Sequence, residues 1–176
     1  MKTTNKLLTL ILIFSSLFSL QSQNKFSKRK IENLKEEVSQ LVEDDKKMTQ
    51  VMIDKVFSFG ELGFQEFETS KYLGKILEEN GFDVEYQISD IPTSWLATWS
   101  NGEGGPTIAL GSDFDGVPST SQYPGVAYEK PVVEGAPGHG EGHNIGLPIV
   151  ITSAIAIKKI MIENNINGKL VLWPGV

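Results

Sequence analysis

Apolar residues recur at three- and four-residue steps through residues 28–59, which is the spacing of one helix face. The positions are Ile31, Leu34, Val38, Leu41, Met48, Met52 and Val56. This pattern predicts an amphipathic helix that is broken near residues 44–45. A second helix is predicted over about residues 66–80, because the same periodicity returns there and Gly81 is well placed to end it.

Four short segments predict strands: residues 83–88, 95–99, 107–111 and 169–173. Residues 107–110 are apolar or β-branched throughout, which is typical of a central strand covered on both faces. A long apolar run follows Pro148 and extends to about Ile162. It is too short for a membrane span and contains two lysines, so we expect a helix packed against an α/β sheet.

The N-terminal segment has the layout of a secretory signal peptide. Two lysines precede the apolar run 7–20, and polarity rises sharply over residues 21–24. We predict a signal peptide over residues 1–22, and hence export to the periplasm or the medium with no stable membrane contact after cleavage. The alternative is an N-terminal anchor that is not cleaved.

Composition excludes several kinds of chemistry. The chain has no cysteine, so disulfides and thiolate metal ligands are absent. A formal net charge of -6 argues against nucleic acid as a partner, since phosphates need a basic surface. An apolar content of 40% is sufficient for a buried core in a domain of this length.

Residues 135–146 concentrate the metal-binding chemistry of the chain. They contain both histidines, His139 and His143, with Glu141 between them and glycines at closely alternating positions. A carboxylate and an imidazole two residues apart share one face of an extended backbone and can reach one divalent ion. The cluster therefore predicts a metal site formed by these three side chains. A flexible glycine loop whose histidines face water is the alternative.

Two aspartates directly follow the apolar strand 107–110. Asp113 and Asp115 lie where the strand ends, and ligands in open α/β sheets bind at the carboxyl ends of strands. Either aspartate could instead cap a turn. The long irregular loop 119–138 then leads to the His/Glu cluster, so we expect it to form a wall of the site.

Four segments in this order resemble the zinc amidohydrolases that include aminobenzoyl-glutamate hydrolases and indole-acetyl-amino-acid hydrolases, relatives of aminoacylases and zinc carboxypeptidases. The segments are ELGFQEFETS at 61–70, DFDGVP at 113–118, GAPGHGEGHN at 135–144 and LWPG at 172–175. The resemblance extends from about residue 30 to the end of the sequence. It implies a three-layer αβα zinc-peptidase-like catalytic domain.

The resemblance also implies an activity. Such enzymes hold a pair of divalent metal ions, zinc, manganese or cobalt, and hydrolyse the amide of an N-acyl or aminobenzoyl amino acid or of a dipeptide. The full-length protein would form a homodimer. Carried over by position, Glu141 and His143 are metal ligands, whereas His139 falls on a histidine that is not usually one. Asp115 would be the catalytic-site carboxylate that orients a ligand histidine.

The sequence departs from the family pattern at two of these positions. Glu141 replaces the family cysteine, which exchanges a soft thiolate for a hard carboxylate and favours manganese or cobalt over zinc. Asn144 replaces an aspartate and removes an acidic group next to the ligands.

The family's general base is a glutamate a few residues beyond the position of Gly175, and the sequence ends at Val176. Residues 23–176 are therefore expected to be the N-terminal portion of a metallohydrolase domain, incomplete at its C-terminus and inactive alone. The alternative is a secreted, non-catalytic metal-binding remnant of the same family.

Overall fold

The structure, a computed structural model, describes residues 26–175, so the predicted signal peptide lies outside the described residues. The chain divides into two compact units, Met1–Asn33 and Leu34–Val176. In the described part of the first unit, the Ser27 hydroxyl accepts a hydrogen bond from the backbone N–H of Lys30 at 3.2 Å, which caps the start of a helix.

The predicted helices and the break between the first two are confirmed. Helix α2 spans Lys28–Asp44 and α3 spans Lys46–Phe59. Helix α4 spans Phe67–Glu79. It ends as predicted at Gly81, where φ is +73° and the N–H of the next residue bonds to the carbonyl of Leu77 at 3.0 Å.

Four strands form one mixed sheet in the order β1-β2-β4-β3. They are β1 (Asp83–Tyr86), β2 (Trp95–Asn101), β3 (Thr107–Asp113) and β4 (Gly168–Gly175), with a short 3-10 turn η1 (Ile88–Asp90) after β1. Strands β1 and β2 pair antiparallel, as do β2 and β4, whereas β3 and β4 are parallel. All four predicted strands are therefore present.

The expected central position of strand 107–111 is wrong for the described sheet. Strand β3 lies at its edge, and the Ile108 side chain is 44% exposed. The reason is the crossover: the chain leaves β3, runs through a helix, and returns as β4 between β2 and β3. An apolar pattern along one strand does not reveal which neighbours will cover it.

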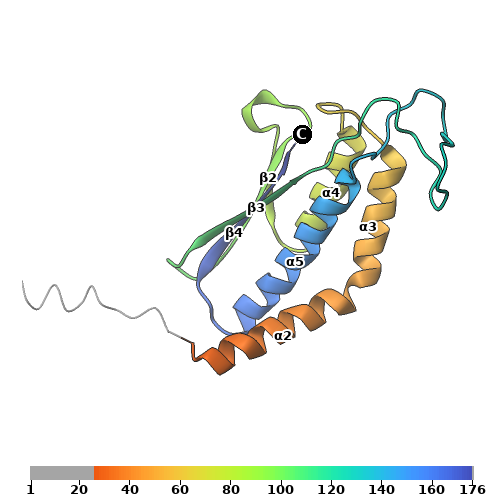
Figure 1. The fold of residues 1–176 in the computed structure, drawn as a ribbon. Coiled ribbons are helices and arrows are strands. Elements are labelled where there is room, and N and C mark those ends of the chain that lie inside the picture. The colour runs from red at the N-terminus through yellow and green to blue at the C-terminus, as the bar shows by residue number, and fades with distance from the viewer. Residues whose placement is uncertain (1–25, 176) are drawn as a thin grey trace, which may run out of the picture. The chain divides into compact units, whose positions relative to one another are not determined.

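Helix α5 (His143–Glu163) fills the space between the sheet and α3. Figure 1 shows α5 (blue) running along the sheet with α3 on its other side. Because α5 is contacted from two sides, it is apolar on more than one face, and by length and composition it could also cross a membrane. Here its buried side chains join the core, whose largest members are Trp95, Phe114, Met52, Leu73, Leu77, Leu147, Ile151, Leu170 and Leu172.

The β3–α5–β4 unit determines where a site can form. Parallel register aligns Asp113 with Gly175, so the carboxyl ends of both strands meet at one edge of the sheet. The α/β class predicted from the sequence is confirmed. Among residues 26–175, helices α4 and α5 contact the sheet from one side, so the described part shows the sheet and one helical side of the predicted three-layer arrangement.

Candidate metal centre

Three loops converge at the carboxyl end of β3. The backbone N–H of Gly116 donates a hydrogen bond to the carbonyl of Glu61, and Leu62 forms an isolated parallel bridge to Gly116. Val117 and Gly138 exchange two backbone hydrogen bonds, of 2.7 and 3.1 Å. The loops at 60–66, 113–118 and 137–142 are thus hydrogen-bonded to one another beside the N-terminus of α5.

His143 is the first residue of α5 and not part of an extended segment. Gly142 has φ +84° and ψ 19°, a left-handed conformation that glycine adopts readily, and the chain turns there into the helix. The expectation that Glu141 and His143 share a face of extended backbone was therefore wrong. The tight turn at Gly142 nevertheless brings their side chains together.

Three carboxylates surround the His143 imidazole. Its Nδ1 atom lies 2.8 Å from Oδ1 of Asp115, while Nε2 lies 3.3 Å from Oε2 of Glu141 and 3.9 Å from Oδ2 of Asp113. The His143 and Asp115 side chains are mostly buried, whereas that of Glu141 is 65% exposed. The structure thus makes the contact between Asp115 and His143 that the resemblance implies.

The hydrogen bond to Asp115 determines what the other imidazole nitrogen can do. When Nδ1–H donates to the carboxylate, Nε2 of the neutral ring carries a lone pair. That lone pair then faces acceptor oxygens of Glu141 and Asp113, which repel it unless a cation or a proton lies between them. Such an arrangement, with a carboxylate behind the histidine, is typical of metal-binding histidines.

The donor set fits a divalent ion in part. Two ligands about 2.0–2.2 Å from one tetrahedral ion lie roughly 3.3–3.6 Å apart, and Nε2 of His143 and Oε2 of Glu141 are 3.3 Å apart. Nitrogen and oxygen donors suit zinc, manganese and cobalt. No group of three or more His, Asp or Glu side chains within residues 26–175 is already arranged to hold an ion, so a third donor such as Asp113 would have to move.

The structure does not bring His139 to this cluster as a ligand. Its Nε2 atom lies 3.0 Å from the carbonyl oxygen of Val56, and its Nδ1 atom is buried. Its ring packs against Phe57 with centroids 6.4 Å apart. Burial lowers the pKa of His139, and hydrogen bonding to the backbone of Val56 and of Asp115 partly opposes this shift. We therefore assign His139 to the contact between the glycine-rich loop and α3.

Sequence reasoning did not single out Glu66, whose side chain is fully buried. Oε1 accepts a hydrogen bond from the N–H of Phe64 at 2.9 Å, and the Thr93 side chain interacts with the same carboxyl. Burial raises the pKa of this carboxyl, hydrogen bonds from Thr93 and the backbone oppose the rise, and the nearby charge of Asp115 adds to it. No local signal distinguishes Glu66 from its neighbours, because its burial depends on the packing of the whole loop.

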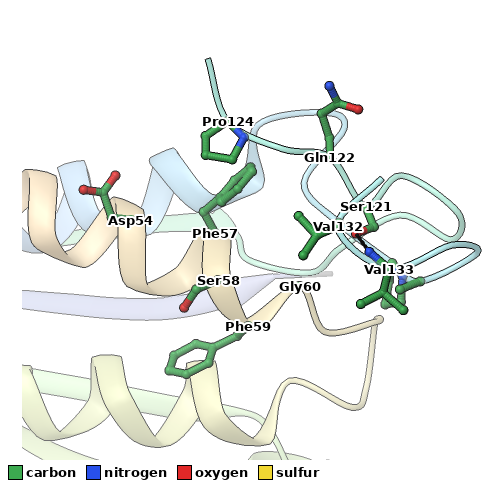
Figure 2. Close-up of a pocket in the computed structure, with 13 residues that line it drawn as sticks. Asp54, Phe57, Ser58, Phe59, Gly60, Ser121, Gln122, Pro124, Val132 and Val133 are labelled. Atoms are coloured by element: carbon green, nitrogen blue, oxygen red, sulfur yellow. Dashed lines mark hydrogen bonds between the residues drawn. The ribbon is translucent and has the colours of Figure 1, made fainter. Parts of the chain in front are cut away.

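A separate cavity of about 690 Å³ lies between the C-terminal end of α3 and the loop 119–138. Figure 2 shows Phe57 and Phe59 of α3 on one side and Pro124, Val132 and Val133 of the loop on the other. Gly138, the residue before His139, also lines this cavity. The loop 119–138 was predicted to form a wall of the site. Its middle part lines this neighbouring cavity, while its two ends lie beside the segments that carry Asp115 and Glu141.

Sequence comparison finds a relative among hydrolases. The chain is 33% identical over 122 residues to one of the subunits of the p-aminobenzoyl-glutamate hydrolase of Escherichia coli (strain K12), an alignment that covers 69% of this chain and 25% of that protein. No family model matches the chain.

Two solved structures share the fold. A protein of methicillin-resistant Staphylococcus aureus described as an aminohydrolase superposes with a TM-score of 0.65 at 19% identity, covering 79% of this chain and 34% of that one. A Bacillus subtilis protein described as a dinuclear metal-binding peptidase of the M20 family gives a TM-score of 0.58 at 24% identity, covering 74% and 36%. The chain is therefore a homologue of a p-aminobenzoyl-glutamate hydrolase subunit with the fold of an M20-type peptidase domain, which confirms the resemblance seen in its sequence.

Proposed function

We propose that this chain carries part of the metal centre of a metal-dependent amidohydrolase. The single observation that carries the proposal is the position of His143, with Nδ1 bonded to Asp115 and Nε2 facing Glu141. The sequence similarity of the chain to a hydrolase subunit over 122 residues supports the same assignment. The chain spans about a quarter of that relative, so the activity of a whole enzyme is part of the proposal.

Each side chain has a separate role in this proposal. Glu141 and His143 hold a divalent ion, and Asp115 fixes the tautomer and the orientation of the His143 ring. Asp113, 3.9 Å from Nε2, is the nearest further donor. A divalent ion held there would polarise the carbonyl of an amide substrate.

The substrate class follows from the relatives. We propose an amide that joins an acyl or aminobenzoyl group to an amino acid, because the homologue is named for such a compound. The cavity lined by Phe57, Phe59 and Val133 lies beside the loop that carries the ligands and has an apolar wall suited to an aromatic group. Dimerisation stays a prediction.

Metal binding and hydrolysis are tested together. Isothermal titration of the purified protein with Mn²⁺, Zn²⁺ and Co²⁺ should show saturable binding that His143→Ala abolishes, while the exposed control Asp83→Asn leaves it unchanged. Release of p-aminobenzoate from p-aminobenzoyl-glutamate, followed by chromatography, then reports turnover. Unchanged metal binding in His143→Ala would contradict the proposal.

A second candidate is metal binding without turnover. It is favoured by the small preset donor set, since residues 26–175 contain no group of three or more His, Asp or Glu side chains placed to hold an ion. Saturable metal uptake with no release of p-aminobenzoate would support this second candidate over the first.

We also propose that the protein is exported, on the basis of the lysines and apolar run at its N-terminus. Cell fractionation followed by mass spectrometry of the N-terminus tests this. Recovery in the periplasm or medium with cleavage between residues 19 and 23 is expected, and a cytoplasmic protein with its N-terminus intact would contradict it.

A further inference from the structure

The Glu66 carboxyl group is unusual because it is fully buried and no cationic side chain of residues 26–175 pairs with it. Glutamate side chains are almost never fully buried unless they are paired. Removing a carboxyl from water costs free energy, so its position needs a compensating role. The hydrogen bond that it accepts from the N–H of Phe64 indicates that role.

This hydrogen bond stabilises a turn in an unfavourable conformation. Oε1 of Glu66 accepts the N–H of Phe64 at 2.9 Å. Phe64 has φ +62°, a left-handed conformation that is an outlier for a bulky residue. The Glu66 carboxyl thus accepts a hydrogen bond from the residue whose backbone conformation is unfavourable, and so stabilises that conformation.

The same turn supports the loop that carries Asp115. Gly116 donates its N–H to the carbonyl of Glu61, and a Cβ at Gly116 would lie 2.9 Å from that oxygen, so the two backbones are in close contact. Leu62 adds an isolated parallel bridge to Gly116. Asp115 immediately precedes this contact, and its carboxylate bonds Nδ1 of His143 at 2.8 Å.

We propose that Glu66 is a positioning residue for the candidate metal centre: by holding the turn at Phe64 it fixes the backbone against which Asp115, and through it the His143 ring, is oriented. The proposal rests on the proposed function in so far as His143 is a metal ligand. It assigns no contact between Glu66 and the metal or the substrate. Glu66 would act only through the turn.

The test follows the tautomer of the His143 ring in metal-free protein. If Glu66 only stabilised the start of α4, its replacement would not change this tautomer. The ¹⁵N signals of the imidazole report its tautomer, and titration with Mn²⁺ reports its competence as a ligand. In Glu66→Ala we expect mixed tautomers at His143 and a metal affinity about tenfold lower or more. Glu66→Gln retains an acceptor for the Phe64 N–H and should restore both readouts, and the exposed control Glu68→Gln should change neither.

A double variant tests the route through the turn and covers the case in which Glu66→Ala does not fold. Glycine adopts a left-handed conformation without support, and Phe64 is 57% exposed, so its replacement loses little burial. Phe64→Gly combined with Glu66→Ala should therefore restore folding and the His143 tautomer. Wild-type tautomer and affinity in folded Glu66→Ala, or no restoration in the double variant, would overturn the proposal.

These outcomes are separable from those of the proposed function. If the wild-type protein binds no metal, the proposed function fails, yet the tautomer of His143 in the variants still tests whether Glu66 positions it.

Discussion

Nδ1 of His143 and Oδ1 of Asp115 lie 2.8 Å apart, although 28 positions separate these residues in the chain. The contact joins the carboxyl end of β3 to the first residue of α5. It leaves Nε2 directed toward the carboxylates of Glu141 and Asp113. The proposed chemistry depends on this pair, so it is the first target for substitution.

Replacement of Asp115 should weaken metal binding without unfolding the chain. Asp115→Ala removes the acceptor that orients His143, and loss of such partners typically costs 10–100-fold in metal affinity. Asp115→Asn keeps an acceptor oxygen and should lose less. Calorimetric titration with Mn²⁺ measures both, with Asp83→Asn as an exposed control. Equal affinities in wild type and Asp115→Ala would show that this contact does not support binding.

Glu141→Cys should change which metal the protein prefers. A thiolate is a softer ligand than a carboxylate, so the affinity for Zn²⁺ should rise relative to Mn²⁺, on the order of tenfold. The Glu141 side chain is 65% exposed, so the exchange should leave folding unaffected. Competition between the two ions measures the ratio. An unchanged ratio would indicate that position 141 is not a ligand.

Burial lowers the pKa of His139, so the free energy of unfolding should depend on pH. The unfolded chain takes up the proton at the ordinary imidazole pKa, whereas the native state resists it. The free energy of unfolding should therefore fall as the pH drops below about 6.5 and stop falling once native His139 is also protonated.

His139→Gln removes this titrating group, so the difference in unfolding free energy between variant and wild type should vary with pH over the same range. Urea denaturation from pH 5 to 8 measures it. The raised pKa of Glu66 acts with the opposite sign, stabilising the native state as the pH falls, and it is present in both proteins, so it cancels in the difference. A difference that does not vary with pH would contradict the prediction.

Gly146→Ala tests the close approach of α5 to β3. Alanine is normally the better helix residue by about 1 kcal/mol. Here a Cβ would overlap Oγ of Ser112 and lie 2.9 Å from its Cβ. We expect a net loss of about 1–3 kcal/mol in the free energy of unfolding. Adding Ser112→Gly should reduce that loss, and a more stable Gly146→Ala protein would contradict the close contact.

The sequence predicted those elements that depend on local pattern. Periodic apolar residues located α3 and α4, and Gly81 ended α4 as expected. The apolar run after Pro148 does not predict the start of α5, because the left-handed Gly142 allows the helix to begin at His143. A proline in the second turn removes one backbone hydrogen bond, and the packed helix tolerates this loss.

The candidate site was predicted only in part, because only some of its features are local in the sequence. Glycines beside His143 and aspartates at the end of a strand are local signals, and the two groups meet in space. The engagement of His139 by Val56 and the burial of Glu66 depend on contacts with α3 and with the Gly116 loop. Such contacts are set by the tertiary fold, and no spacing of residue types reports them.

The proposed metal centre is tested most directly by titrating Zn²⁺ into protein with ¹⁵N-labelled histidine and recording NMR spectra of both imidazole rings. If His143 is a metal ligand oriented by Asp115, its Nε2 signal shifts on metal binding, its Nδ1 keeps its proton toward Asp115, and the His139 signals change little. Saturation that shifts His139 but not His143, or metal addition that alters neither ring, would contradict the proposed metal centre.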